Sequence, residues 1–520
     1  MLRVVTADEA SAIDRAAIAS GTPSFALMQL AGERAAASIG ARWAACLDRV
    51  VVCCGTGNNG GDGWIVATVL ASRGHDVRVV SVGDPTTDDA RRAAAAFRAG
   101  RESFDSMAHE RPTLVVDAVL GTGASGSPRG PAASCIDAIV RWRAAGVPVV
   151  SLDVPSGLDA TSGSAAGAVQ ADHTITFGTM KRGLLIGRGS AGEVTAIDIG
   201  LGAHAAPGHG MLVLLDQAWV AATIPGIPAD SHKGTRRRLA IVGGDEGMAG
   251  ATVLAARGAM RSGIGMVRLI VNPASLPVVQ AAATEATALE WPADDVQAAE
   301  QLNGYAHVVL VGPGLGRTGV SRALLERVLD CWRGPIVIDA DALTLFGGRI
   351  PQLRTVLGGR PALLTPHANE CATLLGVSTD EVRARRFEIA FELATTTGAA
   401  VLLKGVPTVI AEPNGMMLVS AAGTPVLSAA GSGDVLGGIA ATLLAQTADP
   451  FKSGAAAAWI HGRAAEIANR DRPIRGVTLD DVCHALADVW RFDQPAPVPP
   501  VLAELPAVGD DRRNLHRVWR

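Results

Sequence analysis

Two glycine-rich segments hold the residues most suited to chemistry. Gly55–Gly63 reads Gly-Thr-Gly-Asn-Asn-Gly-Gly-Asp-Gly, and Ala429–Gly438 reads Ala-Ala-Gly-Ser-Gly-Asp-Val-Leu-Gly-Gly. Each is expected to open a helix, and each carries an aspartate at the junction. The bare backbone amides at a helix N-terminus bind anions, and glycines let a phosphate approach the backbone closely. The chain therefore has two candidate sites for handling phosphate groups.

Polar residues also follow apolar, strand-like segments in the first half of the chain. Asp117 precedes the loop Gly121–Gly126, and Asp153 precedes Ser156. Ligands of open α/β sheets bind at the carboxyl ends of strands. Asn59, Asp117 and Ser156 offer oxygen ligands with one negative charge, which suits a monovalent cation better than zinc. The alternative is that Asp117 and Asp153 only cap the turns that follow them.

The second half repeats this arrangement at five strand ends. The segments are Gly243–Ala251, Gly312–Gly316, Asp339–Ala342, Thr365–Glu370 and Lys404–Thr408. None of them contains the Gly-Lys-Ser/Thr of a P-loop, which argues against a Walker-type NTPase. Each alone could be a turn or a cap, but together they predict one cleft lined by polar groups.

Strands and helices alternate around these segments. Thr6-Ala7-Asp8-Glu9 fits a capping box at the start of a helix, and a second helix is expected over 26–44. The first series of strands is predicted at 49–54, 76–82, 114–119 and 147–153, with helices near 64–73, 89–99 and 132–145. The second series is predicted at 238–244, 267–271, 308–311, 336–339, 362–365 and 400–403. This alternation predicts an α/β fold with parallel sheets covered by helices on both faces.

Length and composition limit the classes of protein. A chain of 520 residues with 48% hydrophobic and 18% charged residues is globular and long enough for two or three domains. We predict domains at 1–215 and 225–492 and a flexible, proline-rich tail at 493–520. The net charge of −4 does not indicate the basic surface that nucleic-acid binding needs. No apolar run is long enough to span a membrane.

The seven cysteines include no CxxC pair, which argues against zinc and dithiol sites. Cys53 and Cys54 are expected to be small buried hydrophobic residues. With an N-terminus unlike a signal peptide, this cysteine pattern predicts a cytoplasmic protein, and a homo-oligomer is expected.

The first half resembles the NAD(P)H-hydrate epimerase family over about residues 1–205. It carries Asn-Asn-Gly-Gly-Asp-Gly, Val-Asp-Ala-Val-Leu-Gly-Thr-Gly and Asp-Val-Pro-Ser-Gly-Leu-Asp in that order and at similar spacing. The resemblance implies a Rossmann-like three-layer sandwich that epimerises hydrated NADH and NADPH (NADHX and NADPHX) at C6. It implies that Asp153 contacts the dihydropyridine as a catalytic residue.

The same resemblance places K⁺ on Asn59, Asp117 and Ser156. Lys181 is a weaker candidate for phosphate binding or acid catalysis, and its alternative is a solvated loop lysine. The implied substrate contacts are Asn58, Asn59, Gly60, Gly61, Asp62, Gly121, Thr122, Gly123, Ala124, Ser125, Gly126, Ser127 and Asp153.

The second half resembles the ribokinase-like superfamily and, more closely, the ADP-dependent NAD(P)H-hydrate dehydratases, over about residues 225–490. Asp339-Ala-Asp-Ala-Leu343 stands where the family has Asn-Ala-Asp-Ala-Leu, Thr365-Pro-His-Ala-Asn-Glu370 stands for Thr-Pro-His-x-Gly-Glu, and Lys-Gly-x-x-Thr matches at 404–408. The resemblance implies a ribokinase-like α/β domain that uses ADP, with Mg²⁺, to dehydrate the hydrate. The implied ADP contacts are Lys404, Gly405, Val406, Pro407, Thr408 and Gly433. The implied substrate contacts are Ala251, Gly312, Gly314, Gly316, His367 and Asp434.

In this scheme ADP phosphorylates the hydroxyl of the hydrate, and elimination of phosphate restores the dihydronicotinamide. Phosphoryl transfer needs anion-binding amides and a group that moves a proton at the acceptor oxygen, and Gly431 to Asp434 supply both. Asp434 is the predicted catalytic base. The loop before it, Gly423–Gly431, departs from the family pattern, whereas Gly433 and Asp434 match it.

One alternative is an ATP-dependent, vitamin-type kinase of the same superfamily whose first half is a non-catalytic nucleotide-binding module. The fusion of two halves that would share a substrate argues against the kinase. The presence of both Asp117 and Asp153 argues against a non-catalytic first half.

Overall fold

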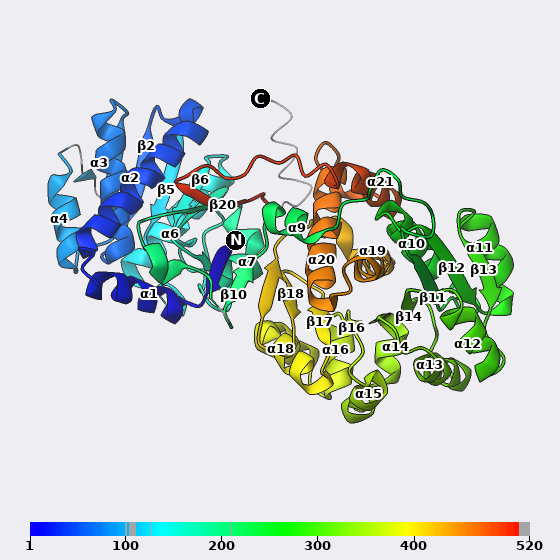
Figure 1. Cartoon of the computed structure of the whole chain (residues 1–520). Helices are drawn as coiled ribbons and strands as arrows, with labels where there is room; N and C mark the ends of the chain where they lie inside the picture. Colours follow the sequence, from blue (N-terminus) through cyan, green and yellow to red (C-terminus); the bar gives the residue numbers. More distant parts are fainter. Residues whose placement is uncertain (99–100, 103–110, 125, 209, 509–520) are drawn as a thin grey trace. The chain divides into compact units, whose positions relative to one another are not determined.

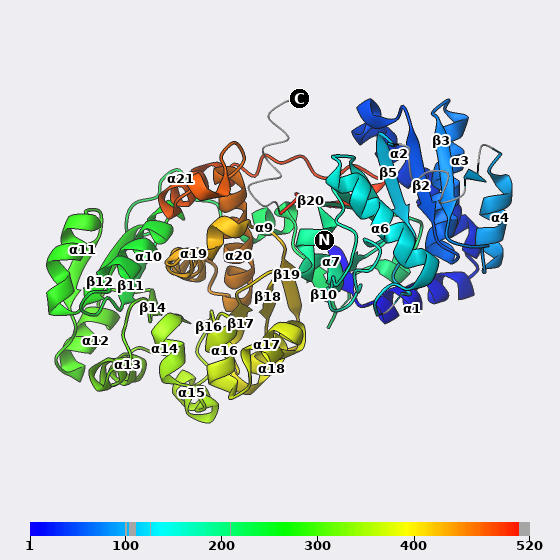
Figure 2. The same cartoon turned by 180° about the vertical axis from the view of Figure 1, so that it is seen from behind.

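The structure is a computed structural model of the chain, and it describes residues 1–98, 101–102, 111–124, 126–208 and 210–508. The chain divides into two compact units. Unit 1 comprises Met1–Gly208 together with Ala496–Gly509, and unit 2 runs from His209 to Pro495. The chain first passes from unit 1 to unit 2 after Gly208, close to the domain boundary predicted at residue 215. Both units are α/β structures with largely parallel sheets, so the predicted fold class is confirmed (Figures 1 and 2).

Unit 1 is built on one eight-stranded sheet in the order β20-β9-β7-β6-β5-β2-β3-β4. Every neighbouring pair is parallel except β20 and β9. Outside this sheet, β1 (Leu2–Val5) pairs in parallel with β8 (Met180–Lys181). The strands of the sheet are β2 (Val50–Cys54), β3 (Val77–Ser81), β4 (Arg101–Glu102), β5 (Leu114–Ala118), β6 (Val149–Leu152), β7 (His173–Phe177), β9 (Glu193–Ile197) and β20 (Val501–Leu505).

Helices cover both faces of this sheet. Helices α1 to α4 pack against the face that carries Val52 and Cys54, and α6 packs against the face that carries Val51 and Cys53. The predicted burial of both cysteines is therefore confirmed. The helices of unit 1 are α1 (Ala7–Ala19), α2 (Ser24–Arg42), α3 (Asn58–Ser72), α4 (Asp88–Ala96), α6 (Gly130–Ala144), α7 (Arg182–Ile186) and α8 (Arg188–Ala191).

The predicted capping box of α1 is present, because Thr6 accepts from the Glu9 amide and Glu9 accepts from the Thr6 amide. The predicted start of α3 near Trp64 is wrong, since the helix begins at Asn58. A Cβ added at Gly60 would lie 2.0 Å from the Gly55 carbonyl oxygen, so glycine is needed for close packing. Because glycine has low helix propensity, a prediction based on propensity places the start of α3 too late.

The prediction of a flexible tail does not hold for residues 501–505. These residues form β20, which pairs antiparallel with β9 and appears as the red strand among the cyan ones in Figure 1. The buried Arg188 side chain also donates a hydrogen bond to the Pro506 carbonyl oxygen. Pairing with a strand some 300 positions away leaves no local signal, because the prolines around β20 dominate its composition. The part of the predicted tail from residue 509 onward lies outside the described residues.

Ending the chain at Pro495 is expected to destabilise unit 1, because β9 would become an unpaired edge strand. The measurement is thermal inactivation of the reaction assigned to unit 1, with the full chain as reference. A second truncation after Val508 serves as the control, because it keeps β20. Equal inactivation temperatures for the chains ending at 495 and 508 would contradict a supporting role of β20.

Unit 2 has the strand order β13-β12-β11-β14-β15-β16-β17-β18-β19-β10. Only the β17–β18–β19 pairs are antiparallel. The predicted second series of strands is present, and β10, β13, β18 and β19 were not predicted. The strands are β10 (Leu212–Leu214), β11 (Arg238–Val242), β12 (Met266–Val271), β13 (Thr287–Glu290), β14 (Val308–Val311), β15 (Ile336–Ile338), β16 (Ala362–Leu364), β17 (Ala400–Leu403), β18 (Thr408–Ala411) and β19 (Met417–Ser420).

Helices α10, α19, α20 and α21 share one large hydrophobic cluster with the strands of unit 2, and Figure 1 shows α19 and α20 side by side. Among the described residues, no helix is both long and apolar enough to cross a membrane. The helices of unit 2 are α9 (Gln217–Thr223), α10 (Ala249–Arg261), α11 (Leu276–Ala282), α12 (Asp295–Asn303), α13 (Gly319–Cys331), α14 (Ala340–Leu345), α15 (Ile350–Leu357), α16 (Ala368–Leu375), α17 (Thr379–Ala384), α18 (Arg386–Thr397), α19 (Ser432–Thr447), α20 (Pro450–Ala468) and α21 (Leu479–Val489).

Candidate active sites

The first site lies where the strand order of unit 1 reverses. The chain runs outward from β2 through β3 to β4 and then returns to β5 on the other side of β2. This is the position at which open α/β sheets bind ligands. The loops after β2 and β5 touch, because a Cβ at Gly55 would lie 1.9 Å from the Val119 carbonyl oxygen and one at Gly121 would lie 3.0 Å from Asn59 Cβ. The structure therefore brings the segments 58–62 and 121–124 together, as predicted. Of the predicted substrate contacts, Ser125 lies outside the described residues.

Asp117 is fully buried at the end of β5 and accepts four hydrogen bonds. Its Oδ1 accepts from Ser156 Oγ (2.5 Å) and the Val119 amide (3.3 Å), and its Oδ2 accepts from Ser151 Oγ (2.8 Å) and the Ser156 amide (2.9 Å). Burial raises the pKa of Asp117, and these hydrogen bonds oppose that rise. Asp117 thus accepts one hydrogen bond from the turn that follows it, at Val119, and three from Ser151 and Ser156, so it does more than cap that turn.

Asn59 is the predicted ion ligand that has no partner. Its side-chain nitrogen and oxygen are both buried and lack a hydrogen-bond partner within the described part of the chain. A buried amide without a partner is costly and indicates an absent ligand, ion or water. Ser156 is engaged instead, since its hydroxyl also accepts from the Leu120 amide at 2.8 Å.

Asp153 and Lys181 form a buried ion pair with 2.7 Å between Nζ and Oδ1. The alternative that Lys181 is a solvated loop lysine is wrong, because it is 3% exposed and also donates to Thr176 Oγ1 and the Phe177 carbonyl. Asp153 has a φ of 63°, a conformation that non-glycine residues rarely adopt. Its Oδ2 accepts from the Thr122 amide at 3.2 Å, which ties the 121–124 loop to this pair.

Two further carboxyl groups, those of Asp62 and Asp14, interact electrostatically with the Asp153–Lys181 pair. Burial, followed by the charges of Asp153 and Asp14, raises the pKa of Asp62 well above its usual range, although Lys181 opposes this. The pKa of Asp14 is raised by burial first and also by Asp153. Several carboxylates near one ammonium favour the protonated form of one of them. Asp62 was predicted only as a substrate contact and Asp14 was not predicted for the site.

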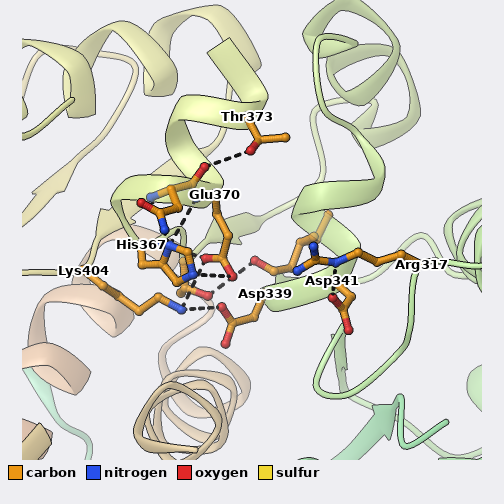
Figure 3. Close-up of polar contacts among 10 residues, drawn as sticks. Arg317, Asp339, Asp341, His367, Glu370, Thr373 and Lys404 are labelled. Atoms are coloured by element: carbon orange, nitrogen blue, oxygen red, sulfur yellow. Dashed lines mark hydrogen bonds and ion pairs between the residues drawn. The ribbon is translucent and has the colours of Figure 1, made fainter. Parts of the chain in front are cut away.

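The second site surrounds Lys404, which follows β17 (Figure 3). Lys404 Nζ lies 2.8 Å from Asp339 Oδ1 and 3.7 Å from Glu370 Oε2. Asp339 follows β15 and is 1% exposed, and Glu370 lies in the first turn of α16. Burial opposes the charge of Lys404, but the neighbouring carboxylates raise its pKa. The sequence placed Asp339 and Glu370 in motifs but did not predict that both carboxylates meet Lys404.

Asp434 lies in the first turn of α19, the helix expected to open at Ser432. Burial, followed by the charge of Asp339, raises the pKa of Asp434 to about 7; Glu370 and Asp341 also raise it, and Lys404 lowers it. A carboxyl group with this pKa can both take and give a proton near neutral pH, which is what a catalytic base needs. A Cβ at Gly433 would lie 3.3 Å from Lys404 Nζ, so the start of α19 lies next to the lysine.

The glycine loop after β14 lies at the same edge of the sheet. A Cβ at Gly312 would lie 1.8 Å from the Asp339 carbonyl oxygen, and one at Gly314 would lie 3.1 Å from Ala251 Cβ. The Gly316 amide donates to Asp341 Oδ2 at 3.0 Å, and Arg317 pairs with the same carboxylate (Figure 3). The structure thus brings the predicted glycine contacts close to Ala251 and to the Asp339 strand end.

His367 caps α16 through one ring nitrogen and faces Glu370 through the other. Its Nδ1 accepts from the Asn369 and Glu370 amides, each at 3.1 Å, which leaves Nε2 as the donor nitrogen of the ring. That nitrogen lies 3.4 Å from Glu370 Oε1, and the side chain is 51% exposed. The half-exposed ring lies beside the Lys404 cluster through Glu370, and a substrate contact of His367 stays a prediction.

The fold and the two sites define a two-unit α/β enzyme in which acid–base groups stand beside glycine loops at strand ends. Among the described residues, no group of three or more His, Cys, Asp or Glu side chains is arranged to hold a metal ion. A family model described as NAD(P)H-hydrate dehydratase matches residues 239–487, and one described as YjeF-related protein N-terminus matches residues 24–183.

Proteins named bifunctional NAD(P)H-hydrate repair enzyme Nnr are similar along nearly the whole chain. The one from Moorella thermoacetica is 34% identical over 522 residues, covering 94% of this chain and 96% of its own. The one from Escherichia coli is 34% identical over 444 residues, covering 84% of each. A crystal structure of ADP/ATP-dependent NAD(P)H-hydrate dehydratase from Bacillus subtilis, co-crystallised with ATP/Mg²⁺, is 31% identical with a TM-score of 0.49, covering 54% of this chain and 99% of that one. The chain belongs to the family of bifunctional NAD(P)H-hydrate repair enzymes.

Proposed function

We propose that this chain repairs hydrated NADH and NADPH in two steps. Unit 1 epimerises the R and S hydrates at C6, and unit 2 dehydrates the S hydrate at the expense of ADP. The observation that carries the proposal is a separate acid–base centre beside glycine loops in each unit, Asp153–Lys181 in unit 1 and Asp434 in unit 2. Membership of the family along both units supports the same assignment, and it does not support a kinase with a non-catalytic first half.

The test is to incubate the pure protein with a mixture of hydrate epimers and to follow the absorbance of the reduced nicotinamide. With ADP, both epimers should be converted to the dihydronicotinamide. Without ADP, the epimers should interconvert but no dihydronicotinamide should form. Conversion of only half of the mixture would overturn the assignment of unit 1, and ADP-independent or absent conversion would overturn that of unit 2.

In unit 2, Asp434 takes the proton of the substrate hydroxyl as the hydroxyl attacks the terminal phosphate of ADP; AMP leaves, and the phosphate ester is then eliminated as inorganic phosphate. Residues 404–408 and Gly433 hold the nucleotide, and the charge of Lys404 lies where phosphate oxygens gather. Mg²⁺, when bound with the nucleotide, neutralises phosphate charge, and phosphate oxygens are its usual ligands. The Nε2–H of His367 orients the substrate.

In unit 1, the C6 hydroxyl stands next to a ring nitrogen. When an acid protonates it, the C6–O bond breaks, the nitrogen lone pair forms a planar C=N bond, and water can add again from either face. Asp62 is the candidate acid, because burial and then the charges of Asp153 and Asp14 raise its pKa and favour its protonated form. Asp153, held by Lys181, contacts the ring and accepts the proton released when water adds, and transfer of that proton through water to Asp62 restores both carboxyl groups.

We further propose that K⁺ binds beside Asn59. The support is the buried side-chain amide of Asn59, which lacks a partner among the described residues and follows β2, the strand paired with the one that carries the buried Asp117. Oxygen donors with a single charge fit a monovalent ion. The fit is partial, because Asp117 already accepts four hydrogen bonds. In this proposal the side-chain oxygen of Asn59 binds the ion directly. Asp117 contributes negative charge nearby, and Ser156 helps to hold Asp117 in place. A cytoplasmic location and a homo-oligomeric state stay predictions from the sequence.

Epimerisation is expected to be faster in potassium than in lithium at equal ionic strength, and Asn59→Ala should remove most of that difference. The physical reason is that the variant deletes the only predicted ion ligand that lacks an internal partner. The measurement is the epimerisation rate of wild type and variant in both salts. Asn369→Ala, in unit 2, is the control for a general effect of losing an amide. Equal rates of the wild type in both salts would contradict the ion site.

A further inference from the structure

Arg386 is a buried cation, and no carboxylate of the described residues balances its charge. It begins α18, and its side chain is 7% exposed. Among the residues that the structure describes, it makes one hydrogen bond, to the Pro407 carbonyl oxygen, and no ion pair. Burial lowers its pKa, and Arg383, a second positive group, lowers it further. Since a guanidinium has five N–H donors, most of its donor capacity is unused.

The guanidinium lies against the loop that connects β17 with β18. A Cβ at Gly405 would lie 2.5 Å from Arg386 Nη1 and 2.8 Å from Nη2, so only glycine lets the loop approach the guanidinium this closely. Gly405 also has a φ of 151°, which favours glycine. The loop is thus held at Pro407 and packed at Gly405 by one side chain from a different element. Its first residue is Lys404, whose ammonium points instead toward Asp339 and Glu370.

A buried charge without a counter-ion costs several kcal/mol of desolvation unless an opposite charge arrives. The carboxylates of the second site neutralise Lys404, but none is paired with Arg386. An anion seated on the 404–408 loop would lie next to this charge in a poorly solvated place, where the attraction is strong. The unbalanced cation therefore indicates an anionic ligand on the loop.

We propose that Arg386 is the positioning residue that makes the 404–408 loop a diphosphate site. It fixes the backbone of the loop through Pro407 and places a buried positive charge beside it. This inference rests on the proposed use of ADP by unit 2, and it adds a residue that no motif of the sequence marked.

Three substitutions separate the contribution of the Arg386 charge from that of its hydrogen bond to Pro407. Arg386→Lys keeps the charge, Arg386→Gln keeps a donor for Pro407 without the charge, and Arg386→Met keeps neither. The matched control is Arg360→Met, because Arg360 is also buried, at 8% exposure, and donates only to the backbone carbonyls of Leu329, Trp332, Val356 and Leu357. The probe is ADP, with measurements of KM, kcat and the ADP-induced shift of Tm.

Arg386→Met and Arg386→Gln should raise KM for ADP about 10-fold or more, as expected for losing an interaction with a charged group, with kcat changed less than about 3-fold. Their ADP-induced Tm shift should shrink, while Tm without ADP is kept, because the cost of burying the charge is removed as well. Arg386→Lys should recover part of the affinity. Arg360→Met should lower Tm and leave KM unchanged.

Unchanged KM and an unchanged ADP-induced Tm shift in Arg386→Gln would overturn the inference, even if Arg386→Met does not fold. A loss of Tm without ADP, like that of Arg360→Met and with wild-type KM, would show a merely structural role. If the wild type uses ADP and the variants are unaffected, only this inference falls. If the wild type neither dehydrates with ADP nor gains stability from it, the proposed function falls and the inference falls with it.

Discussion

Asp434→Asn is expected to lower ADP-dependent dehydration by about 10²–10⁴-fold, the usual cost of losing a general base. Asparagine has nearly the same shape and cannot accept the hydroxyl proton. The measurement is the rate of dihydronicotinamide formation at saturating ADP and hydrate, with circular dichroism to confirm folding. Asp380→Asn is the control, because Asp380 is exposed and forms only a surface pair with Arg383. A turnover of Asp434→Asn equal to that of the wild type would remove Asp434 from the mechanism.

The pKa of about 7 sets the direction of two pH effects at Asp434. A base must be deprotonated, so dehydration should accelerate as the pH rises through about 7. Stability should change in the opposite sense: the pKa is raised from 3.8 to about 7 in the folded state, so Asp434 lowers stability progressively between about pH 4 and pH 7, and the loss is complete above pH 7. At pH 8, the Tm of Asp434→Asn should therefore equal or exceed that of the wild type. If the Tm of Asp434→Asn at pH 8 were lower than that of the wild type, the ionised Asp434 carboxylate would stabilise the fold, which would contradict its raised pKa.

Asp153→Asn is expected to lower epimerisation by about 10²–10⁴-fold, because it removes the carboxylate that we propose contacts the ring and accepts a proton. Asparagine tolerates a φ of 63° better than most residues, so the backbone of this turn should be kept. The substitution leaves Lys181 buried without its counter-ion, which costs about 3–5 kcal/mol. The measurements are the rate of epimer interconversion and the free energy of unfolding.

The double variant Asp153→Asn/Lys181→Met separates chemistry from stability. It removes both members of the buried pair, so it should recover part of the lost stability and none of the activity. Dehydration of the S hydrate by unit 2 serves as the internal control, since its residues are untouched. Epimerisation by Asp153→Asn at the wild-type rate would contradict a catalytic role for Asp153.

The strands that precede the glycine loops could be predicted from the sequence, because each is a short apolar run followed by turn residues. Asp434 and Lys404 could be placed at the second site for the same reason. The meeting of Lys404 with Asp339 and Glu370 could not be predicted, because it depends on three strand ends from separate parts of the chain. The burial of Lys181 was missed because a lysine after a short strand is usually solvated.

Close packing explains why the start of α3 was predicted too late. Tertiary pairing explains why a strand was missed in the predicted flexible tail. Gly60 belongs to a helix in spite of its low propensity, because the helix start must approach the Gly55 backbone. Val501–Leu505 is a strand because β9 offers it a free edge, and nothing in the five residues themselves specifies that partner. Arg386 escaped prediction because an arginine in an arginine-rich segment at a helix start usually faces water.

The pairing of β20 with β9 has a consequence for synthesis of the chain. The ribosome completes β9 long before it reaches β20, since all of unit 2 is encoded between them. During that interval the nascent sheet carries an open edge with unpaired backbone groups, a surface that recruits other strands. Unit 1 can therefore finish folding only after unit 2 has been translated, and chaperone binding to β9 should persist until the last residues leave the ribosome.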